Sequence, residues 1–290
     1  MTTSTGDWIA GARPRTLWTA IAPVAVGTAS AHAVGAAALL PASLALGVAL
    51  CMQIGVNYAN DYSDGVRGTD ADRIGPHRLV ASGKATPSAV KLAAFTFFGV
   101  AALLGLYLTL LSGQWWLLIV GAIAIVAAWT YTGSSRPYGY GGWGEVSVFA
   151  FFGPIAVAGT MLTQAEQVTW WALLASVGVG NYAVALLMIN NIRDLDTDAL
   201  AGKRTLAVRQ GHFRARQLFA ATVMSPVLIA LAVALAHPWV LLATVVALPS
   251  LLVAIGMRVS TPGATLTPFF GGVSAIGLVY GLMVAVGIAL

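Results

Sequence analysis

Charged residues and cysteines are both scarce in this sequence of 290 residues. Lysine, arginine, aspartate and glutamate together make up 9% of the chain, against roughly 25% in soluble domains. The one cysteine, Cys51, lies inside an apolar run, which excludes a disulfide framework and argues for a packing role over a zinc or redox site. These shortages exclude an ordinary soluble domain and a disulfide-stabilised secreted scaffold.

Apolar residues dominate instead, at 58% of the chain with a mean hydropathy of +0.83. Runs near the roughly 20 residues that cross a bilayer recur along the sequence. They predict an all-α polytopic membrane helix bundle of about nine transmembrane helices, with a central cavity capped by cytoplasmic loops, as a single domain over 1–290. The expected spans are 16–33, 41–60, 88–111, 114–131, 144–163, 168–190, 215–236, 238–257 and 266–289.

The basic residues lie at the ends of these spans rather than on a separate soluble face. With nine spans, all 15 lysines and arginines fall on one side of the membrane. The positive-inside rule then places the N-terminus and these loops in the cytoplasm and the C-terminus outside the cell membrane. The net charge of +5 is therefore explained by topology, and we expect no nucleic-acid partner.

Two acidic patches stand out at the cytoplasmic ends of spans two and six. They read NYANDYSDGVRGTD from Asn57 and NNIRDLDTD from Asn190. Asn60-x-x-x-Asp64 is repeated as Asn190-x-x-x-Asp194, at an offset of 130 residues (190 − 60). This pattern predicts parallel half-repeats, spans one to four and five to eight, with span nine added.

Helical geometry places most of these polar side chains on one face of each patch. At about 100° per residue, each set occupies an arc of about 100° if the helix continues to its end. Asp196 points to the opposite side and is the weakest candidate ligand. The two sets are Asn57, Asn60, Asp61 and Asp64, and Asn190, Asn191, Asp194 and Asp198.

Oxygen ligands without cysteine or a nearby histidine favour Mg²⁺, which is often shared between one or two carboxylates and substrate phosphates. Facing carboxylates would repel one another unless a cation and a polyanion lie between them. Neighbouring basic residues suit the phosphates, and the membrane suits a long hydrocarbon. An isoprenyl diphosphate meets both requirements. The basic candidates are Arg67, Arg78, Arg193, Lys203 and Arg204.

Two simpler interpretations remain open. Acidic residues at helix ends are often only solvated interfacial groups, although two matched patches make this less convincing than one. The loop arginines and lysines also serve as topology markers, whether or not they contact a phosphate.

The motifs resemble those of the UbiA-type intramembrane prenyltransferases, whose signatures are N-D-x-x-D after helix two and D-x-x-x-D after helix six. Here they read Asn60-Asp61-Tyr62-Ser63-Asp64 and Asp194-Leu195-Asp196-Thr197-Asp198. The sequence is most similar to the branch that prenylates 1,4-dihydroxy-2-naphthoate. The segments that carry this resemblance are ARPRTL from Ala12, QIGVNYANDYSDGVRGTD from Gln53, GPHRLVASG from Gly75, YTGSSRPYGYGGWGEV from Tyr131 and NNIRDLDTDALAGKRTLAVRQG from Asn190.

The resemblance implies a Mg²⁺-dependent transfer of a polyprenyl group from its diphosphate to the naphthoate ring, with loss of CO₂, giving demethylmenaquinol. The implied catalytic and metal-binding residues are Asp61, Asp64, Asp194 and Asp198. A third aspartate common in relatives is replaced here by Gly68, which leaves the role of Asp70 open. The substrate-binding candidates are Asn57, Asn60, Arg67, Arg78, Tyr131, Arg136, Tyr138, Asn190, Asn191, Lys203 and Arg204.

Several residues carry two interpretations each. Arg13 and Arg15 suit either the acceptor carboxylate or anchoring of the N-terminal segment, and Glu145 suits either a helix start or the site. Tyrosine rings near the site would stabilise a prenyl cation, or they form the interfacial aromatic belt. These are Tyr58, Tyr62, Tyr131, Tyr138 and Tyr140.

Two rival functions use the same features. One is the same chemistry on another acceptor, such as 4-hydroxybenzoate, haem, chlorophyllide or homogentisate. The other is a cation-coupled transporter built on intramembrane carboxylates. Against the transporter, the acids lie at one membrane face among basic loops.

Overall fold

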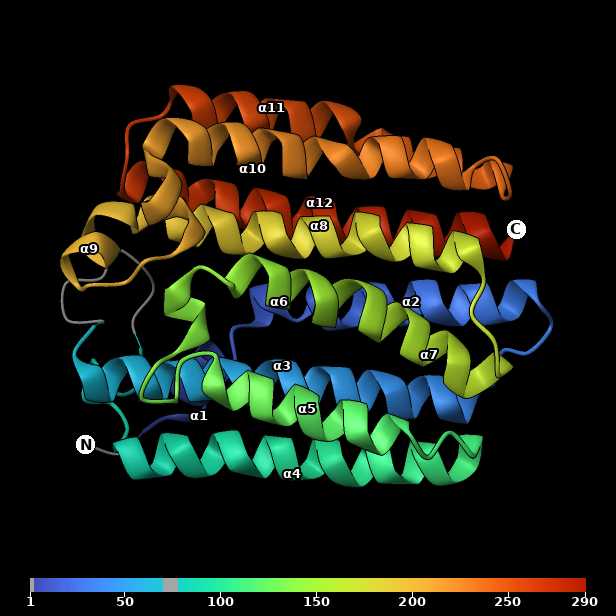
Figure 1. Ribbon diagram of the computed structural model, residues 1–290, viewed down its shortest axis with the longest axis horizontal. Coiled ribbons are helices and arrows are strands. Elements are labelled where there is room, and N and C mark those ends of the chain that lie inside the picture. Colours follow the sequence, from blue (N-terminus) through green and yellow to red (C-terminus); the bar gives the residue numbers. More distant parts are fainter. Residues whose placement is uncertain (1–2, 70–77) are drawn as a thin grey trace.

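Long helices packed side by side make up the bundle (Figure 1). The computed structural model describes residues 3–69 and 78–290, and every regular element in those ranges is helical. The α-helices are α1 (Thr5–Gly11), α2 (Trp18–Ala33), α3 (Leu39–Arg67), α4 (Pro87–Ser112), α5 (Leu117–Thr130), α6 (Gly144–Ala150), α7 (Ala156–Ala165), α8 (Trp170–Arg193), α9 (Leu195–Leu200), α10 (Leu206–Val233), α11 (Ala247–Val259) and α12 (Thr267–Ala289). The other helical elements are the 3-10 helices η1 (Pro14–Thr16), η2 (Tyr138–Gly141), η4 (Pro238–Val246) and η5 (Ala264–Leu266) and the π-helix η3 (Phe151–Ile155).

The all-α membrane architecture that the sequence predicts is confirmed. Among the described residues, seven helices are long and apolar enough to cross a membrane. Gly144–Ala165 joins α6, η3 and α7, and Pro238–Val259 and Ala264–Ala289 each join a 3-10 helix to an α-helix. The other two expected spans fall on α2 and α5, which have 16 and 14 residues. At about 1.5 Å per residue these two are shorter than a bilayer core, so the count of nine stays a prediction.

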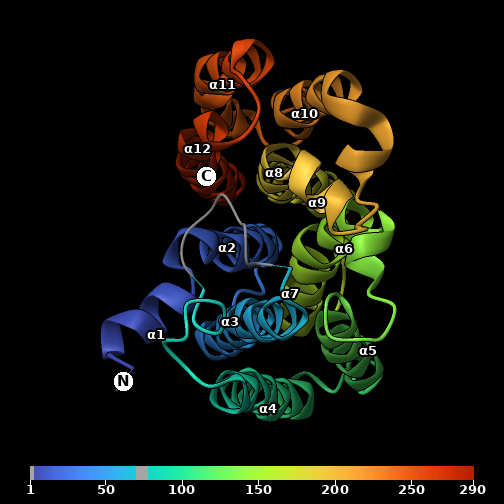
Figure 2. The ribbon, with the colours of Figure 1, turned by 90° about the vertical axis from the view of Figure 1, so that its left-hand side faces the viewer.

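Helix α8 lies at the centre of the bundle and positions one side of the site. It packs against α2, α6, η3, α7, α10 and α12 (Figure 2), and most of its apolar stretch is buried. Small residues permit this close packing: a Cβ added to Gly153 of η3 would lie 2.7 Å from the Ser176 carbonyl oxygen of α8. Helix α3 packs mainly against α4 and supplies the other side.

Three helix ends differ from the expected spans. Helix α3 continues to Arg67, so the first acidic patch is helical, and Gly68 ends the helix with φ of 71°. Helix α8 ends at Arg193, and Asp194 separates it from α9. The second patch is therefore not one continuous helix, contrary to the assumption under which its polar side chains share one face. Helix α10 begins at Leu206 instead of 215, because Thr205 caps it and Gly211 adopts a kink with φ 71° and ψ 167°.

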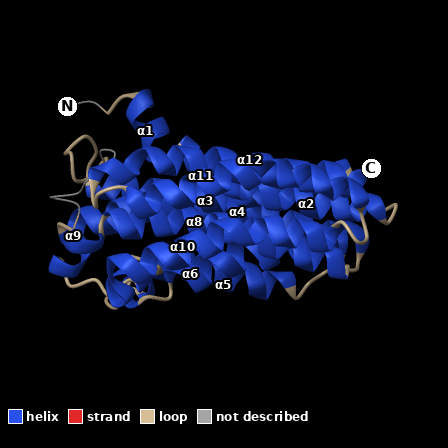
Figure 3. Ribbon diagram, turned by 90° about the horizontal axis from the view of Figure 1, so that it is seen from above, coloured by secondary structure: helices blue, strands red, loops and turns tan. Residues whose placement is uncertain are grey.

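The connections next to the two acidic patches gather at one end of the bundle. Figure 1 shows α9, the end of α3 and the N-terminus at that end, and the C-terminus at the other. The same separation is visible from above in Figure 3. Asp70 lies outside the described residues.

Candidate active site

The two acidic patches, far apart in sequence, meet around Tyr140 of η2. The Tyr140 hydroxyl donates to Asp64 Oδ1. Lys203 Nζ lies 4.8 Å from the centre of the Tyr140 ring and 3.1 Å from Asp198 Oδ1. A continuous chain of contacts thus joins the end of α3 to α9. We call Asp61, Asp64, Asp194 and Asp198 the acidic cluster.

In the first patch, the two aspartates contact different partners. Asp61 is buried, and its carboxylate accepts hydrogen bonds from the backbone N–H groups of Leu79 at 2.8 Å and Val80 at 3.0 Å. Asp64 is also buried, and its Oδ2 lies 3.9 Å from Arg78 Nη2. Asp61 therefore holds the segment that places Arg78 beside Asp64.

The other polar residues of α3 connect to the loop after α5. Arg67 donates to the carbonyl oxygens of Thr132 and Ser134, and its guanidinium carbon lies 5.7 Å from the centre of the Tyr140 ring. Asn60 Oδ1 accepts from the Thr132 hydroxyl at 2.8 Å. These contacts fix the loop that carries Tyr140 against α3.

The second patch is held by ion pairs and by Glu145. Asp194 receives two hydrogen bonds of 2.7 Å from Arg193, a bidentate pair. Asn191 Nδ2 donates to Glu145 Oε1 at 2.9 Å. The other oxygen of Glu145, Oε2, is buried and lacks a hydrogen-bond partner among the described residues. Glu145 therefore faces α8 inside the bundle rather than solvent.

The local electrostatics reflect this crowding of acids. Burial raises the pKa of Asp198; the charge of Lys203 opposes this, and the charges of Asp194 and Asp64 add to it. Burial and the neighbouring Asp64 carboxylate also raise the pKa of Tyr140. Tyr140 is therefore a neutral hydrogen-bond donor at physiological pH. A cation entering the cluster would relieve the repulsion between the carboxylates.

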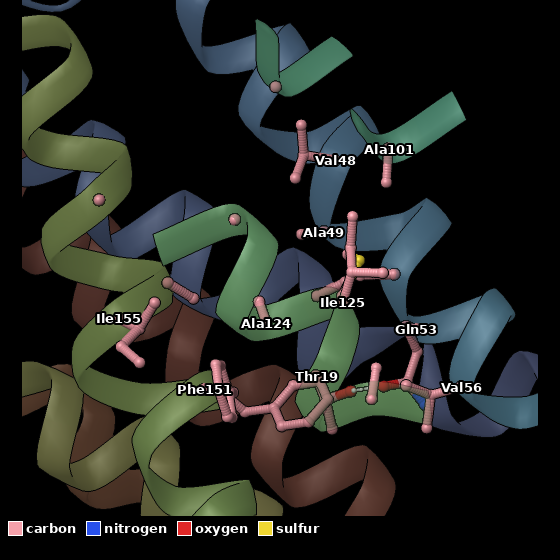
Figure 4. Close-up of a pocket in the computed structure, with 18 of the residues that line it drawn as sticks. Thr19, Val48, Ala49, Gln53, Val56, Ala101, Ala124, Ile125, Phe151 and Ile155 are labelled. Carbon is pink, nitrogen blue, oxygen red and sulfur yellow. Dashed lines mark hydrogen bonds between the residues drawn. The ribbon is translucent and has the colours of Figure 1, made fainter. Parts of the chain in front are cut away.

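A cavity of about 530 Å³ extends from the polar end into the apolar part of the bundle. Asn57, Asn60 and Asn190 line its polar end, and Asp61 and Asp64 lie one and four residues beyond Asn60 on α3, outside the cavity lining. Figure 4 shows apolar side chains of the remaining wall, among them Val48, Ile125 and Ile155. The cavity can therefore hold a long hydrocarbon with its polar head toward the acidic cluster.

The remaining predicted site residues lie in varied surroundings. Arg136 and Arg204 are exposed, and the backbone N–H of Arg204 donates to the Tyr140 carbonyl oxygen at 2.7 Å. Asp196 is exposed and lies 3.1 Å from His212. Asn57 donates both amide hydrogens to the N-terminal segment, at Ala12 O and Thr16 Oγ1. Tyr131 and Tyr138 line the cavity, with ring centres 5.4 Å apart.

Sequence reasoning missed Gln53 as a site residue. Its side chain is buried, lines the cavity and contacts Asn57 and Thr16. The sequence signal for Gln53 is an amide inside an apolar span, four residues before Asn57 and therefore on the same helix face.

The donor set suits a metal only together with a phosphate ligand. Within residues 3–69 and 78–290, no three acidic, histidine or cysteine side chains lie close enough to hold a metal by themselves. Mg²⁺ usually keeps several waters and takes only one or two carboxylates plus substrate phosphates. The all-oxygen cluster beside Arg78 and Lys203 therefore fits a Mg²⁺-diphosphate.

The fold and site define an integral membrane helix bundle with an acidic cluster at one end of a largely apolar cavity. The chain belongs to the UbiA prenyltransferase family, whose model matches residues 20–270. This confirms the resemblance drawn from the two aspartate motifs.

Relatives with assigned names are similar over most of the chain. The chain is 49% identical to 1,4-dihydroxy-2-naphthoate octaprenyltransferase of Mycobacterium tuberculosis, covering 99% of this chain and 98% of the relative. It is 41% identical to the Escherichia coli protein of the same name, covering 76% and 73%. A solved UbiA homologue from Archaeoglobus fulgidus bound to GPP and Mg²⁺ has the same fold, with a TM-score of 0.64, 16% identity and coverage of 97% and 99%.

Proposed function

We propose that this protein transfers a polyprenyl group from its diphosphate to 1,4-dihydroxy-2-naphthoate, with Mg²⁺ as the cofactor. The prenyl C–O bond breaks, a bond forms to the ring carbon that bears the carboxylate, and CO₂ leaves. The products are demethylmenaquinol and diphosphate. The observation that carries the proposal is the meeting of both acidic patches around Tyr140 at the polar end of an apolar cavity.

Each part of the site has a task in this reaction. Asp64, Asp194 and Asp198, with Asp61 beside them, would hold the metal, and Mg²⁺ when bound neutralises the departing diphosphate. Arg78 and Lys203 are the cations placed to contact phosphate oxygens. The apolar cavity wall excludes water from the carbocation, and the faces of Tyr131 and Tyr138 at that wall favour positive charge.

We place the acidic cluster on the cytoplasmic side of the membrane, where the basic connections lie. The positive-inside rule supports this orientation. Prenyl diphosphate would then enter with its charged head in the cytoplasm and its chain in lipid.

The test is turnover by purified protein in detergent with geranylgeranyl diphosphate, 1,4-dihydroxy-2-naphthoate and Mg²⁺. We expect a prenylated naphthoquinol and one CO₂ per diphosphate released. EDTA, Asp64→Ala and Asp194→Ala should each abolish both products, and Tyr107→Phe on the exposed face of α4 should not.

Other outcomes would redirect the assignment. Consumption of the diphosphate only with another aromatic acceptor would refute the naphthoate substrate and leave the chemistry intact. A folded, monodisperse protein that turns over no acceptor would refute the enzyme function, and cation flux in proteoliposomes would then support the transporter.

A further inference from the structure

A compact group of polar side chains interrupts the apolar cavity wall between α2 and α3. We call Thr16, Thr19, Gln53 and Asn57 the polar network. All four are buried, at 2–8% exposure, and all four line the cavity. Figure 4 shows Thr19 and Gln53 directed at each other, with Phe151 and Val56 nearby. Polar groups are costly to place in a membrane core, so the network needs a reason beyond packing.

The amide hydrogens of Gln53 and the hydroxyl hydrogen of Thr16 are all donated within the protein. Gln53 Nε2 donates to Thr16 Oγ1 at 3.0 Å and to Asn57 Oδ1 at 3.3 Å. Thr16 donates its own hydroxyl proton to the Arg13 carbonyl at 2.9 Å. The amide of Gln53 is therefore fixed with its nitrogen toward Thr16 and its oxygen away from it.

One acceptor is left with only a weak partner. Gln53 Oε1 has the Thr19 hydroxyl at 3.4 Å, but that hydroxyl lies much nearer the Thr16 carbonyl, at 2.6 Å. A hydroxyl can donate only one hydrogen bond, and the Thr19 hydroxyl donates it to the nearer acceptor, the Thr16 carbonyl oxygen. Gln53 Oε1 and the lone pairs of Thr19 Oγ1 therefore form a pair of hydrogen-bond acceptors in the cavity wall.

The surroundings indicate what would supply the missing donor. Arg13 also lines the cavity, with its Nη2 3.3 Å from the Asn57 carbonyl oxygen, and has a left-handed backbone with φ of 53°. Its charge, which also acts on Asp61, favours an anionic occupant, and Phe151 and Val56 add apolar surface to the same cavity. A prenyl chain has no hydroxyl to donate, whereas an aromatic hydroxy acid has both a donor and an anionic group.

We infer that Gln53 and Thr19 recognise a ring hydroxyl of the aromatic acceptor and thereby select hydroxylated acids. This inference rests on the proposed function and adds to it the residues that discriminate between acceptors. Gln53 Oε1 accepts a hydrogen bond from the ring hydroxyl, and Thr19 Oγ1 offers a second acceptor beside it. The ring lies against the apolar wall within reach of the prenyl group.

The experiment compares acceptors as well as variants. Purified full-length protein with Mg²⁺ and geranylgeranyl diphosphate is assayed with 1,4-dihydroxy-2-naphthoate and with each of its two monomethyl ethers. Methylation removes one donor at a time. The variants are Gln53→Met and Thr19→Val. The control is Ser176→Ala, which removes a buried hydroxyl bonded at 2.6 Å to the carbonyl three residues earlier, as in Thr19, but outside this network.

We expect wild type to prefer the dihydroxy acid over one of the ethers by about tenfold in kcat/KM beyond their intrinsic reactivities. Gln53→Met should raise the KM of the acid about tenfold, change the KM of the diphosphate by less than about twofold and abolish the preference. Thr19→Val should reduce the preference by about threefold. Ser176→Ala should keep it.

The preference ratio separates recognition from damage to the fold, because misfolding lowers the rates with all three acceptors alike. An unchanged preference in both variants, or an equal loss for the acid and the ethers, would overturn the inference and leave a structural network. If Gln53→Met does not fold, Thr19→Val decides by the same ratio. A wild-type protein that does not turn over the naphthoate would instead refute the proposed function.

Discussion

Asp61 and Asp64 lie three residues apart on α3, yet their carboxylates have different neighbours. Asp61 accepts two backbone hydrogen bonds from the segment at Leu79 and Val80, whereas Asp64 contacts Tyr140 and Arg78. Both belong to the same motif. Asp61 therefore fixes the backbone of the segment at Leu79 and Val80, which Asp64 does not do.

Replacing these two residues should separate stability from activity. Asp61→Ala leaves two N–H groups without an acceptor, a loss of about 1–3 kcal/mol for each buried group, so its Tm should fall by several degrees. Asp64→Ala removes an ion pair of 3.9 Å with Arg78 and a hydrogen bond from the Tyr140 hydroxyl, so the Tm of this variant should fall less than that of Asp61→Ala. Size-exclusion profiles after heating measure this difference. Equal losses of Tm would contradict the architectural role of Asp61.

Tyr140 provides a prediction about pH. Its raised pKa means that the phenol loses its proton only above the usual value of about 10. Tyr140→Phe should raise the KM of the diphosphate by about threefold to tenfold, because a donor to Asp64 is lost. The kcat pH profile should keep its shape between about pH 6 and pH 9. Loss of a basic limb in the variant alone would show that Tyr140 titrates in this range.

At the scale of elements, the kink in α10 depends on one glycine. Gly211 has φ 71° and ψ 167°, a region that is nearly restricted to glycine. The kink lets the short helical stretch that precedes it lie over the loop of η2, where Arg209 Nη2 donates to the Gly141 carbonyl at 2.5 Å. A local backbone preference thus helps to place Tyr140.

Gly211→Ala should destabilise the protein by about 1–3 kcal/mol through backbone strain, although open space surrounds the position. Gly271→Ala is the matched control. It also has open space, but it lies inside α12 with an ordinary helical backbone, so alanine should be neutral or stabilising by up to about 1 kcal/mol. Thermal unfolding of both variants measures the contrast. Equal behaviour would mean that the kink relaxes without cost.

At the scale of the whole molecule, charged residues gather at one end of the bundle, whereas exposed tryptophans lie at both ends, with Trp143 just after η2 at the charged end. Exposed tryptophans such as Trp115, Trp170 and Trp239 lie next to short connections, whereas the acidic cluster and its cations lie among the longer ones. Interfacial tryptophans suit a membrane boundary. The two ends of the bundle therefore differ in their content of charged residues.

This asymmetry predicts the orientation. A green fluorescent protein fused after Leu290 should remain dark, and alkaline phosphatase fused there should be active, because nine crossings from a cytoplasmic N-terminus would place the C-terminus outside. The same reporters at the N-terminus should behave in the opposite way. Reporters that place both termini on one side would contradict the nine-span topology and favour an even number of crossings.

Much of this protein is determined by the sequence alone. Long apolar runs require helices in a bilayer, because only a helix satisfies its own backbone hydrogen bonds there. Helical periodicity places Asp61 and Asp64 on one face, and the paired motifs identify the family, as the match over 20–270 confirms.

Only the tertiary structure decided which groups face one another. Tyr140 reaches Asp64 across 76 residues of sequence, and Gln53 meets Thr16 across 37 residues. The Arg204 backbone N–H bonds to the Tyr140 carbonyl oxygen, and the side chains of Arg136 and Arg204 are exposed; their binding of substrate stays a prediction. Periodicity specifies the direction of a side chain from its own helix axis, but the partner depends on how neighbouring helices rotate and pack. Packing, not pattern, therefore determines the site.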